Sequence, residues 1–302
     1  MRIGFVGLGM MGFPMVENLA GGGEAEVLAF DRDRGALVRL STLPSYGDTL
    51  SACEDLAALA RCDVVITMLP NSAITSRIIE GGGGETGLSG ILARGATIVD
   101  MGSSDPMETL RLAPLLEAAG IAFVDAPVSG AVAKARAGTL AIMAGADDDT
   151  FARVEPILSR MGSTLIRCGA VGSAHAMKTL NNYVYAAGLL AVSEALAIAE
   201  RLNLDASIFA DVLNASSGRN VASETKLKQF IIPRDFAGGF ALALQAKDLA
   251  TATKLKEVTG LDAQLLGLCD AVWRRALEQA EPGADNTTIY QHVARRTAAV
   301  AT

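Results

Sequence analysis

A glycine-rich turn directly after the first apolar run constrains the fold of this chain more than any other feature. Residues 3–6 are continuously apolar, and the sequence then reads Gly7-Leu8-Gly9-Met10-Met11-Gly12 before a helical stretch at 11–20. In such a strand–turn–helix unit the first glycine allows the tight turn, the second lets backbone approach a ligand, and the third lets the helix pack on the sheet. The helix N-terminus attracts phosphate charge, so the pattern predicts a dinucleotide site. A plain glycine turn is the alternative.

An acidic residue follows at the spacing that such a site requires. Asp31 ends the next apolar run, 27–30, close to the interval of about 20 residues expected for an acid that binds a ribose 2′-hydroxyl. A carboxylate there repels a 2′-phosphate, so NAD is favoured over NADP, although Arg32 or Arg34 could bind a phosphate instead. The predicted cofactor-binding residues in this part of the chain are Gly7, Leu8, Gly9, Met10, Met11, Gly12, Asp31 and Arg32.

Short apolar runs alternate with helical patterns through about the first 165 residues, and alternation of this kind predicts a parallel sheet with helices on both faces. We therefore predict an N-terminal Rossmann-type doubly wound α/β domain. The predicted strands are 3–6, 27–30, 64–68, 97–100 and 122–124, and helices between them include 11–20, 53–60 and 107–119. Residues 140–143 and 165–167 are expected to extend the sheet around a helix at 149–160.

The second half of the chain is helical in pattern. Residues 173–201 contain no breaker except Gly188 and predict one long helix. Further helices are expected at 206–214, 221–229, 242–259 and 263–281, and strand patterns almost vanish. The predicted organisation is a Rossmann domain over 1–165 joined by the long helix to a C-terminal all-α domain within 166–302.

Composition narrows the class of protein. Half of the 302 residues are apolar, which excludes disorder, and the net charge of −7 opposes a nucleic-acid surface. The longest apolar tract, 183–192, is shorter than the roughly 20 residues of a membrane span, and the first apolar run is too short for a secretory signal. Four cysteines without CxxC spacing and two distant histidines indicate neither disulfides nor a metal site. We expect a cytoplasmic protein without membrane or nucleic-acid partners.

Asp125-Ala126-Pro127-Val128-Ser129-Gly130-Ala131 follows a predicted strand, at the sheet edge where open α/β sheets bind ligands. Backbone N–H groups around Ser129, Gly130 and Ala131, with the Ser129 hydroxyl, could form a nest for a substrate carboxylate. A strand-ending turn explains the local pattern equally well.

Lys178 and Asn182 are four residues apart on the long predicted helix and share a face, with Asn181 close by. Partial burial of this lysine would lower its pKa and suit proton transfer, whereas a solvated lysine beside a polar edge is the alternative. His175 is expected to serve packing or the surface. Lys247-Asp248, early in another helix, is either part of a site or a surface ion pair.

Taken in order, these stretches resemble the β-hydroxyacid dehydrogenase family, which includes 3-hydroxyisobutyrate dehydrogenases and tartronate semialdehyde reductases. The resemblance covers nearly the whole chain. Its motifs are the glycine-rich start at 7–15, Thr67-Met68-Leu69-Pro70-Asn71, the stretch 125–130 with Gly138-Thr139-Leu140, Gly172 with Lys178 to Asn182, and Lys247-Asp248-Leu249.

The resemblance implies a role for each matched position. Lys178 would be the catalytic acid/base, Ser129 and Gly130 would bind the substrate carboxylate, Asn182 would contact the reacting oxygen or its neighbour, and Lys247 would lie near nicotinamide and substrate. Leu69, Pro70 and Ser103 would contact the cofactor. Family members are usually dimers or tetramers, so a homodimer or homotetramer is expected.

Three positions depart from the family pattern. Ala131 replaces a second glycine after Ser-Gly, Lys134 replaces a later glycine, and Ala174 ends what is usually a GxG. Ala131 adds a methyl group beside the proposed carboxylate nest and Lys134 adds charge. These departures leave the reaction class intact and put the usual substrate in doubt.

The resulting hypothesis is an NAD-dependent oxidoreductase that interconverts a small 3-hydroxy acid and its semialdehyde, with NADP as the possible alternative cofactor. A 6-phosphogluconate-type decarboxylating dehydrogenase is a rival, but its lysine motif carries a histidine where this chain has Asn181. An imine reductase is another, although those relatives typically replace the lysine. A non-catalytic Rossmann-type binding or scaffold protein is the rival from a different class.

Overall fold

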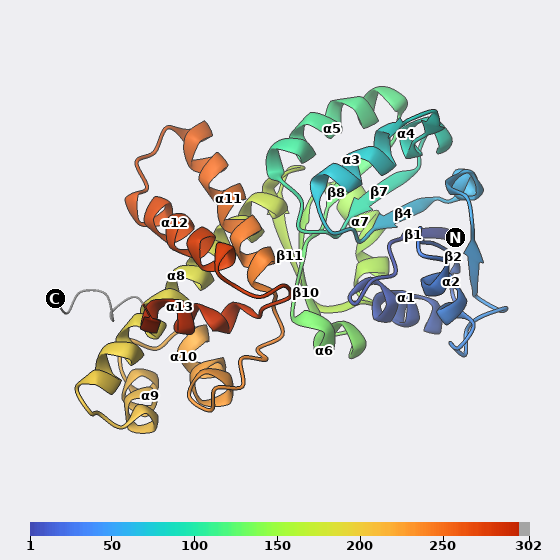
Figure 1. Cartoon of the computed structure of the whole chain (residues 1–302). Helices are drawn as coiled ribbons and strands as arrows, with labels where there is room; N and C mark the ends of the chain where they lie inside the picture. Colours follow the sequence, from blue (N-terminus) through green and yellow to red (C-terminus); the bar gives the residue numbers. More distant parts are fainter. Residues whose placement is uncertain (296–302) are drawn as a thin grey trace. The chain divides into compact units, whose positions relative to one another are not determined.

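The computed structural model describes residues 1–295, which form two compact units, one comprising Met1–Lys178 and the other beginning at Thr179 (Figure 1). The sequence predicted the boundary between residues 165 and 166. Residues 166–178 group with the first unit because strand β11 (Gly162–Gly169) pairs with the sheet and because Gly172 and His175 donate backbone hydrogen bonds to Asp125.

The first unit contains the predicted doubly wound sheet. Six parallel strands lie in the order β3-β2-β1-β4-β7-β8, which is the strand order of a dinucleotide-binding fold. Their bounds are β1 Arg2–Val6, β2 Glu26–Phe30, β3 Leu50–Cys53, β4 Val64–Thr67, β7 Thr97–Asp100 and β8 Ala122–Asp125. Val6 pairs with Phe30 and Thr67, and Asp100 pairs with Asp125, so the carboxyl ends of the strands meet at one edge.

The sheet contains antiparallel strands beyond β8, which corrects the expectation of an all-parallel sheet. Strand β10 (Leu140–Gly145) runs antiparallel to β8 and to the short β9 (Val128–Ser129), and parallel to β11. The chain leaves β9 through the short helix α6 (Ala131–Arg136) and returns alongside it, which reverses the strand direction. An antiparallel strand at the margin of a parallel sheet is common in large α/β folds.

Helices cover both faces of the sheet (Figure 1), and alternating side chains of each strand supply two apolar cores. In β4, for example, Ile66 belongs to the core under α1 and Val65 to the core under α5. The first core involves α1 (Gly12–Gly21), α2 (Arg34–Leu40), α6 and α7 (Asp148–Leu158). The second involves the 3₁₀ helix η1 (Leu56–Arg61), α3 (Ser72–Glu80), α4 (Leu88–Ile91) and α5 (Pro106–Ala119).

The predicted helix at 53–60 is wrong at its start. Cys53 ends β3, and the helix begins at Leu56 as a 3₁₀ helix because the Asp55 side chain accepts a hydrogen bond from Ala57 N and caps it. Strand β3 and helices α2, α3, α4 and α6 were not predicted, since they are short and leave few residues over which a period can be recognised. Gly81–Gly82 and Glu85–Thr86 form a two-stranded hairpin, β5–β6, in the glycine patch.

The second unit is helical, as predicted. Its core surrounds the fully buried Trp273. Its elements are the greater part of α8 (Ser173–Arg201), α9 (Ala206–Ala215), α10 (Val221–Thr225), the π-helical turn η2 (Leu227–Ile231), α11 (Leu242–Thr259), α12 (Gln264–Glu278), η3 (Asn286–Thr288) and α13 (Ile289–Arg295). Within residues 1–295, α8 alone is long and apolar enough to cross a membrane. Its residues Ala186, Leu189 and Leu196 belong to the core around Trp273, which is typical of a core helix.

Candidate active site

The glycine-rich turn has the backbone geometry that its sequence predicts. Gly7 has φ +104°, and a methyl group on it would collide with the Met68 carbonyl oxygen. A methyl group on Gly12 would collide with the Gly7 carbonyl, so α1 packs directly on the turn. Gly9 faces open space, with nothing within 4 Å of where a Cβ would stand. The turn therefore combines a tight bend with one exposed stretch of backbone.

This turn fits the pyrophosphate of a dinucleotide. The exposed backbone at Gly9 precedes α1, whose first turn carries no acidic residue to oppose an anion. Leu8 is buried beneath the turn, whereas the Met10 side chain is 81% exposed. Of the predicted cofactor-binding residues in the turn, Gly9 and Met10 thus present surface, and Gly7, Leu8 and Gly12 shape it.

Asp31 is tied to the same turn. Its Oδ2 accepts a hydrogen bond from Leu8 N at 2.6 Å and its Oδ1 accepts one from Asp33 N at 2.8 Å. The carboxylate is therefore fixed at the carboxyl end of β2, beside the glycine-rich turn, where an acid recognises a ribose hydroxyl. Each carboxylate oxygen retains a lone pair for such a contact. The neighbouring Arg32 is exposed.

The turns after β4 and β7 lie against one another and carry the other predicted cofactor contacts. Ser72 Oγ accepts a hydrogen bond from Asp105 N at 2.6 Å, and a methyl group on Gly102 would lie 3.0 Å from the Leu69 carbonyl oxygen. Leu69 and Ser103 are half-buried and Pro70 is exposed. All three therefore lie along the carboxyl edge of the sheet that also holds the glycine-rich turn.

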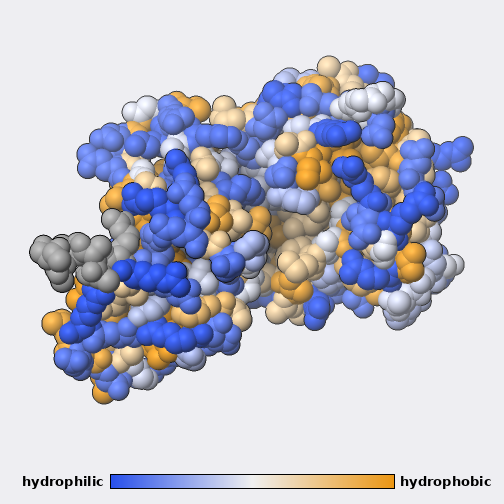
Figure 2. Space-filling view, in the orientation of Figure 1, coloured by the Kyte–Doolittle hydropathy of each residue, from blue (hydrophilic) through white to orange (hydrophobic). Residues whose placement is uncertain are grey.

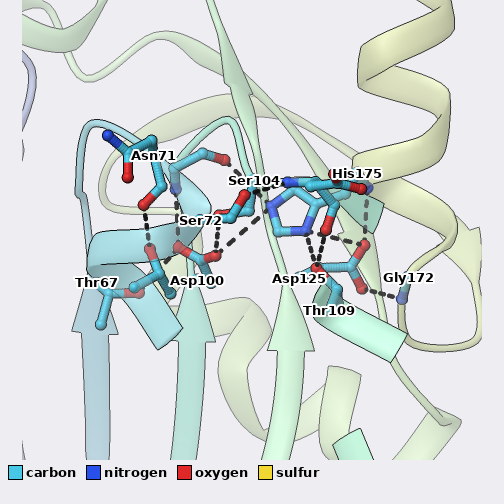
Figure 3. A network of polar contacts seen from close by, with 12 residues as sticks. Thr67, Asn71, Ser72, Asp100, Ser104, Thr109, Asp125, Gly172 and His175 are labelled. Atoms are coloured by element: carbon cyan, nitrogen blue, oxygen red, sulfur yellow. Dashed lines mark hydrogen bonds and ion pairs between the residues drawn. The ribbon is translucent and has the colours of Figure 1, made fainter. Parts of the chain in front are cut away.

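A buried polar network, shown in Figure 3, occupies the ends of β7 and β8. Asp100 accepts hydrogen bonds from Thr67 Oγ1 at 2.9 Å, Ser104 Oγ at 2.5 Å and Gly102 N at 3.2 Å. It thereby orders the loop that carries Ser103. This network was not among the predicted sites, but two acidic residues at the ends of apolar strands are the sequence signal that points to it.

Asp125 at the end of β8 holds the beginning of α8. Its Oδ1 accepts a hydrogen bond from Gly172 N at 2.7 Å and its Oδ2 one from His175 N at 2.8 Å. A carboxylate at a helix N-terminus satisfies N–H groups that lack an intrahelical partner and complements the helix dipole. Asp125 therefore fixes the helical turn that leads to Lys178.

Ser129, Gly130 and Ala131 form a turn of unusual backbone conformation between β9 and α6. Gly130 has φ +139° and Ala131 has φ +54°, which an alanine rarely adopts. The stem of Lys134 lies on Gly130, since a methyl group on Gly130 would be 2.6 Å from Lys134 Cδ. Two of the three departures from the family pattern thus lie directly at the predicted carboxylate-binding turn.

Lys178 is half-buried on α8, one turn after His175. In unit 1 the structure places this turn at the carboxyl edge of the sheet, because Asp125 binds the backbone of residues 172 and 175. The glycine-rich turn, Asp31, the loop of Ser103 and the start of α8 therefore share one sheet edge. The described residues, 1–295, include no group of three or more His, Cys, Asp or Glu side chains that could hold a metal ion.

The remaining predicted residues are organised within unit 2 by Asp248. Asn182 Nδ2 donates a hydrogen bond to Asp248 Oδ2 at 2.6 Å, and Lys247 Nζ lies 3.2 Å from Asp248 Oδ1. Gln245 Nε2 donates to the Asn182 carbonyl oxygen at 3.2 Å. Asn182 and Asp248 are buried, and Lys247 is half-buried. Asp248 was named only as a partner of Lys247 in the sequence, and its contact with Asn182 is a tertiary one.

A half-buried tyrosine adjoins this group. Asn286 Nδ2 lies 3.5 Å from both Tyr185 Oη and Gln245 Oε1. Burial raises the pKa of the Tyr185 hydroxyl to about 12, so it is protonated at neutral pH. Tyr185 thus extends a neutral polar network from α8 to η3.

Two models of known protein families together match nearly the whole chain. Residues 2–172 match the family model described as the NAD binding domain of 6-phosphogluconate dehydrogenase. Residues 172–293 match the model described as NAD-binding of NADP-dependent 3-hydroxyisobutyrate dehydrogenase.

Individual relatives are similar over most of their length. The chain is 39% identical over 252 residues to 2-(hydroxymethyl)glutarate dehydrogenase of Eubacterium barkeri, covering 83% of this chain and 81% of that protein. It is 33% identical over 295 residues to human mitochondrial 3-hydroxyisobutyrate dehydrogenase, covering 96% and 85%. The solved structure of Mycobacterium tuberculosis 3-hydroxyisobutyrate dehydrogenase with L-serine has a TM-score of 0.86 at 30% identity, covering 96% of this chain and 98% of that one.

Proposed function

Because the chain belongs to the β-hydroxyacid dehydrogenase family and is an NAD(P)-dependent hydroxyacid dehydrogenase, we propose that it oxidises a small 3-hydroxy acid reversibly to its semialdehyde. The observation that carries the proposal lies within unit 1. There the dinucleotide turn with Asp31, the loop of Ser103 and the helical turn that leads to Lys178 share one sheet edge.

Lys178 is the proposed acid/base. A bound nicotinamide supplies the hydride acceptor or donor. In oxidation the Lys178 amine takes the proton from the substrate hydroxyl as the C–H bond breaks, and in reduction its ammonium returns that proton to the carbonyl oxygen. Positioned proton transfer of this kind contributes about 10²–10⁴-fold to the rate.

The substrate contacts are proposed from the family resemblance. N–H groups of the turn at Ser129 and Gly130 would bind the substrate carboxylate, and Ala131 and Lys134 would modify that turn. Asn182 and Lys247 would contact the substrate, with Lys247 near the cofactor. Their common partner Asp248, which holds both side chains, supports this assignment within unit 2.

NAD is the proposed cofactor in preference to NADP. The support is the Asp31 carboxylate, which Leu8 N and Asp33 N hold beside the glycine-rich turn, because its charge repels a 2′-phosphate. A comparison of kcat/KM for the two cofactors decides the point, and a clear preference for NADP would contradict it.

The reaction is tested by adding NAD⁺ or NADP⁺ with a panel of 3-hydroxy acids and following the absorbance of the reduced nicotinamide. The panel comprises 3-hydroxyisobutyrate, L-serine, L-threonate, glycerate and 2-(hydroxymethyl)glutarate. Turnover of 6-phosphogluconate with release of CO₂ would favour the decarboxylating rival, and turnover of cyclic imines in the presence of NADPH would favour an imine reductase. Cofactor binding without turnover of any of these compounds would support a non-catalytic binding protein.

Lys178→Ala is expected to lower kcat by about 10²–10⁴-fold, because it removes the proton acceptor, while the affinity for NADH changes little. Lys228→Ala is the matched control, since Lys228 forms only a surface ion pair with Asp211. Stopped-flow kinetics and NADH fluorescence titration measure the two quantities. Unchanged kcat, or an equal loss of NADH affinity, would contradict the assignment.

We also propose that the protein is a homodimer or homotetramer in the cytoplasm. Support for the oligomer comes from large apolar side chains that are exposed on α8 and α9, among them Val184, Ile198, Ile208 and Val212. The four cysteines are free thiols, which is typical of proteins in reducing compartments, and cell fractionation checks the location.

A further inference from the structure

We propose that His175 is a positioning residue that joins the cofactor-side loop of Ser103 to the helical turn of Lys178. This inference rests on the proposed function, because it assigns His175 a role in placing the acid/base of that reaction. All the contacts that carry it lie within unit 1.

The His175 ring is 1% exposed, and both ring nitrogens are engaged (Figure 3). Nε2 lies 3.1 Å from the Gly102 carbonyl oxygen, and Nδ1 lies 2.8 Å from Thr109 Oγ1. Because a carbonyl oxygen only accepts, Nε2 carries a proton and donates it to Gly102. A buried ring with both nitrogens occupied does not touch the substrate, so His175 is not itself the acid/base.

The ring of His175 contacts the loop that carries Ser103, a predicted cofactor contact. Gly102 and Ser104 flank Ser103, and both are bonded to Asp100 at the end of β7. The His175 ring adds a second anchor to this loop through the Gly102 carbonyl. Its Nε2 is 3.9 Å from Asp100 Oδ2, so the ring packs directly against the carboxyl group that orders the loop.

The backbone of His175 holds the helical turn that leads to Lys178, the proposed acid/base. Its N–H donates to Asp125, which also binds Gly172 N, so the first turn of α8 is fixed to the end of β8. Lys178 follows three residues later and shares the helix face of His175. A shift of the His175 turn therefore moves Lys178 by a similar amount. One residue thus sets the loop of Ser103 and the turn of Lys178 relative to each other.

The rate of a positioned proton or hydride transfer is sensitive to such shifts. A misplacement of about 1 Å can lower a rate by about 100-fold. A histidine that only filled space would, in contrast, change the fraction of folded protein and leave the rate constant of the folded molecules unchanged.

Two amide substitutions separate the contacts of the ring. The glutamine side chain places its amide nitrogen where histidine has Nε2, so His175→Gln retains the donor to Gly102. The shorter asparagine places its amide near the Nδ1 position. His175→Asn therefore retains the Thr109 contact and loses the hydrogen bond to the Gly102 carbonyl oxygen in the loop. We expect His175→Asn to lower the single-turnover rate constant for NADH formation about 10–100-fold, and His175→Gln to stay within about threefold of wild type.

The single-turnover rate constant does not depend on how much of the protein is folded, so it distinguishes positioning from stability. Val154→Ala removes buried side-chain volume from the core under α7 and serves as the destabilised control, with an unchanged rate constant expected. A wild-type rate constant in His175→Asn would overturn the proposal, as would an equal loss in His175→Gln.

Hydrogen exchange provides a second measurement that needs no substrate. In His175→Asn we expect faster exchange of the amides of residues 101–105, which lose their anchor on the ring, and unchanged protection of residues 172–178, because the backbone N–H groups of residues 172 and 175 still donate to Asp125. In His175→Gln and Val154→Ala we expect unchanged protection of both segments. Absence of turnover by the wild-type protein would contradict the proposed function. The exchange data would still show whether His175 holds the loop of Ser103. Unchanged protection of residues 101–105 in His175→Asn would overturn the positioning role of His175 even in an active enzyme.

Discussion

Ala131 has a left-handed backbone conformation that an L-alanine adopts at a cost. Its φ is +54°, and it directly follows Gly130 with φ +139°. The left-handed region costs a residue with a Cβ about 1–2 kcal/mol, and backbone strain of this kind clusters at functional sites. The family pattern has glycine at this position, so this chain retains the turn of Ser129 and Gly130 with a less suitable residue.

Ala131→Gly is therefore expected to raise the free energy of unfolding by about 0.5–1 kcal/mol, since relief of the strain exceeds the entropy cost of glycine. Ala133→Gly, in the same helix but without a positive φ, is the matched control and should lower it by about 0.5–1 kcal/mol. Urea titrations followed by circular dichroism measure both. Equal destabilisation by the two substitutions would show that Ala131 is not strained.

Helix α8 depends on a side chain from another element for its N-terminal hydrogen bonds. Asp125 is fully buried and accepts from two backbone N–H groups at the start of the helix. Other helices are capped from within their own segment, as Asp147 caps α7 by accepting from Thr150 N at 2.8 Å. The helix that carries Lys178 is thus coupled to the sheet, whereas α7 is capped locally.

Asp125→Asn is expected to lower the free energy of unfolding by about 1–3 kcal/mol. The amide NH₂ cannot accept a hydrogen bond, so one of the two buried backbone N–H groups loses its partner. Asp147→Asn, at an exposed cap, should change it by less than about 0.5 kcal/mol, since asparagine and aspartate cap helices almost equally well. Urea titration compares the two variants. A loss in Asp125→Asn no greater than that in Asp147→Asn would contradict the capping role.

Among the helices and strands, those with a strong local sequence pattern were predicted closely. Helix α8 has the predicted bounds of 173–201, and α11 has the predicted bounds of 242–259, because neither segment contains an internal breaker apart from Gly188. The predicted helix over 221–229 is instead α10 followed by a π-helical turn, with an irregular φ of −122° at Lys226. Nothing local in the sequence signals that change.

On the scale of the whole molecule, large apolar side chains remain exposed on the helical unit. Ile208 and Val212 on α9 are 64% and 56% exposed, and Ile198 on α8 and Leu202, which directly follows that helix, are 61% and 65% exposed. Figure 2 shows hydrophobic surface among hydrophilic side chains at the end of this unit that holds α9. Large apolar side chains that remain exposed in this number are typical of a protein interface, and a second copy of the chain is the proposed partner.

Light scattering is expected to give two or four times the chain mass of 31.2 kDa. The double substitution Ile208→Glu and Val212→Glu should shift the mass toward a single chain, because it buries charge in the interface. Val38→Glu, at an isolated exposed position on α2, is the control and should leave the mass unchanged. A wild-type mass of one chain would contradict the proposed oligomer.

The sequence by itself determined the dinucleotide turn, the alternation that builds the doubly wound sheet, the helical second half and the family. These features depend on neighbours along the chain: glycine spacing, apolar periodicity and strand-ending residues. Ser129, Lys178 and Lys247 were proposed from motifs, and their roles stay predictions.

Only the tertiary structure decided how the polar residues pair. Asp125 meets His175 across 50 positions of the chain, His175 meets Gly102 across 73, and Asn182 meets Asp248 across 66. Such contacts exist only once the parallel strands align their carboxyl ends and α8 and α11 pack, so no local pattern encodes them. A buried polar group must find a partner wherever the fold brings one, and that requirement, rather than sequence spacing, places His175 between the ends of β7 and β8.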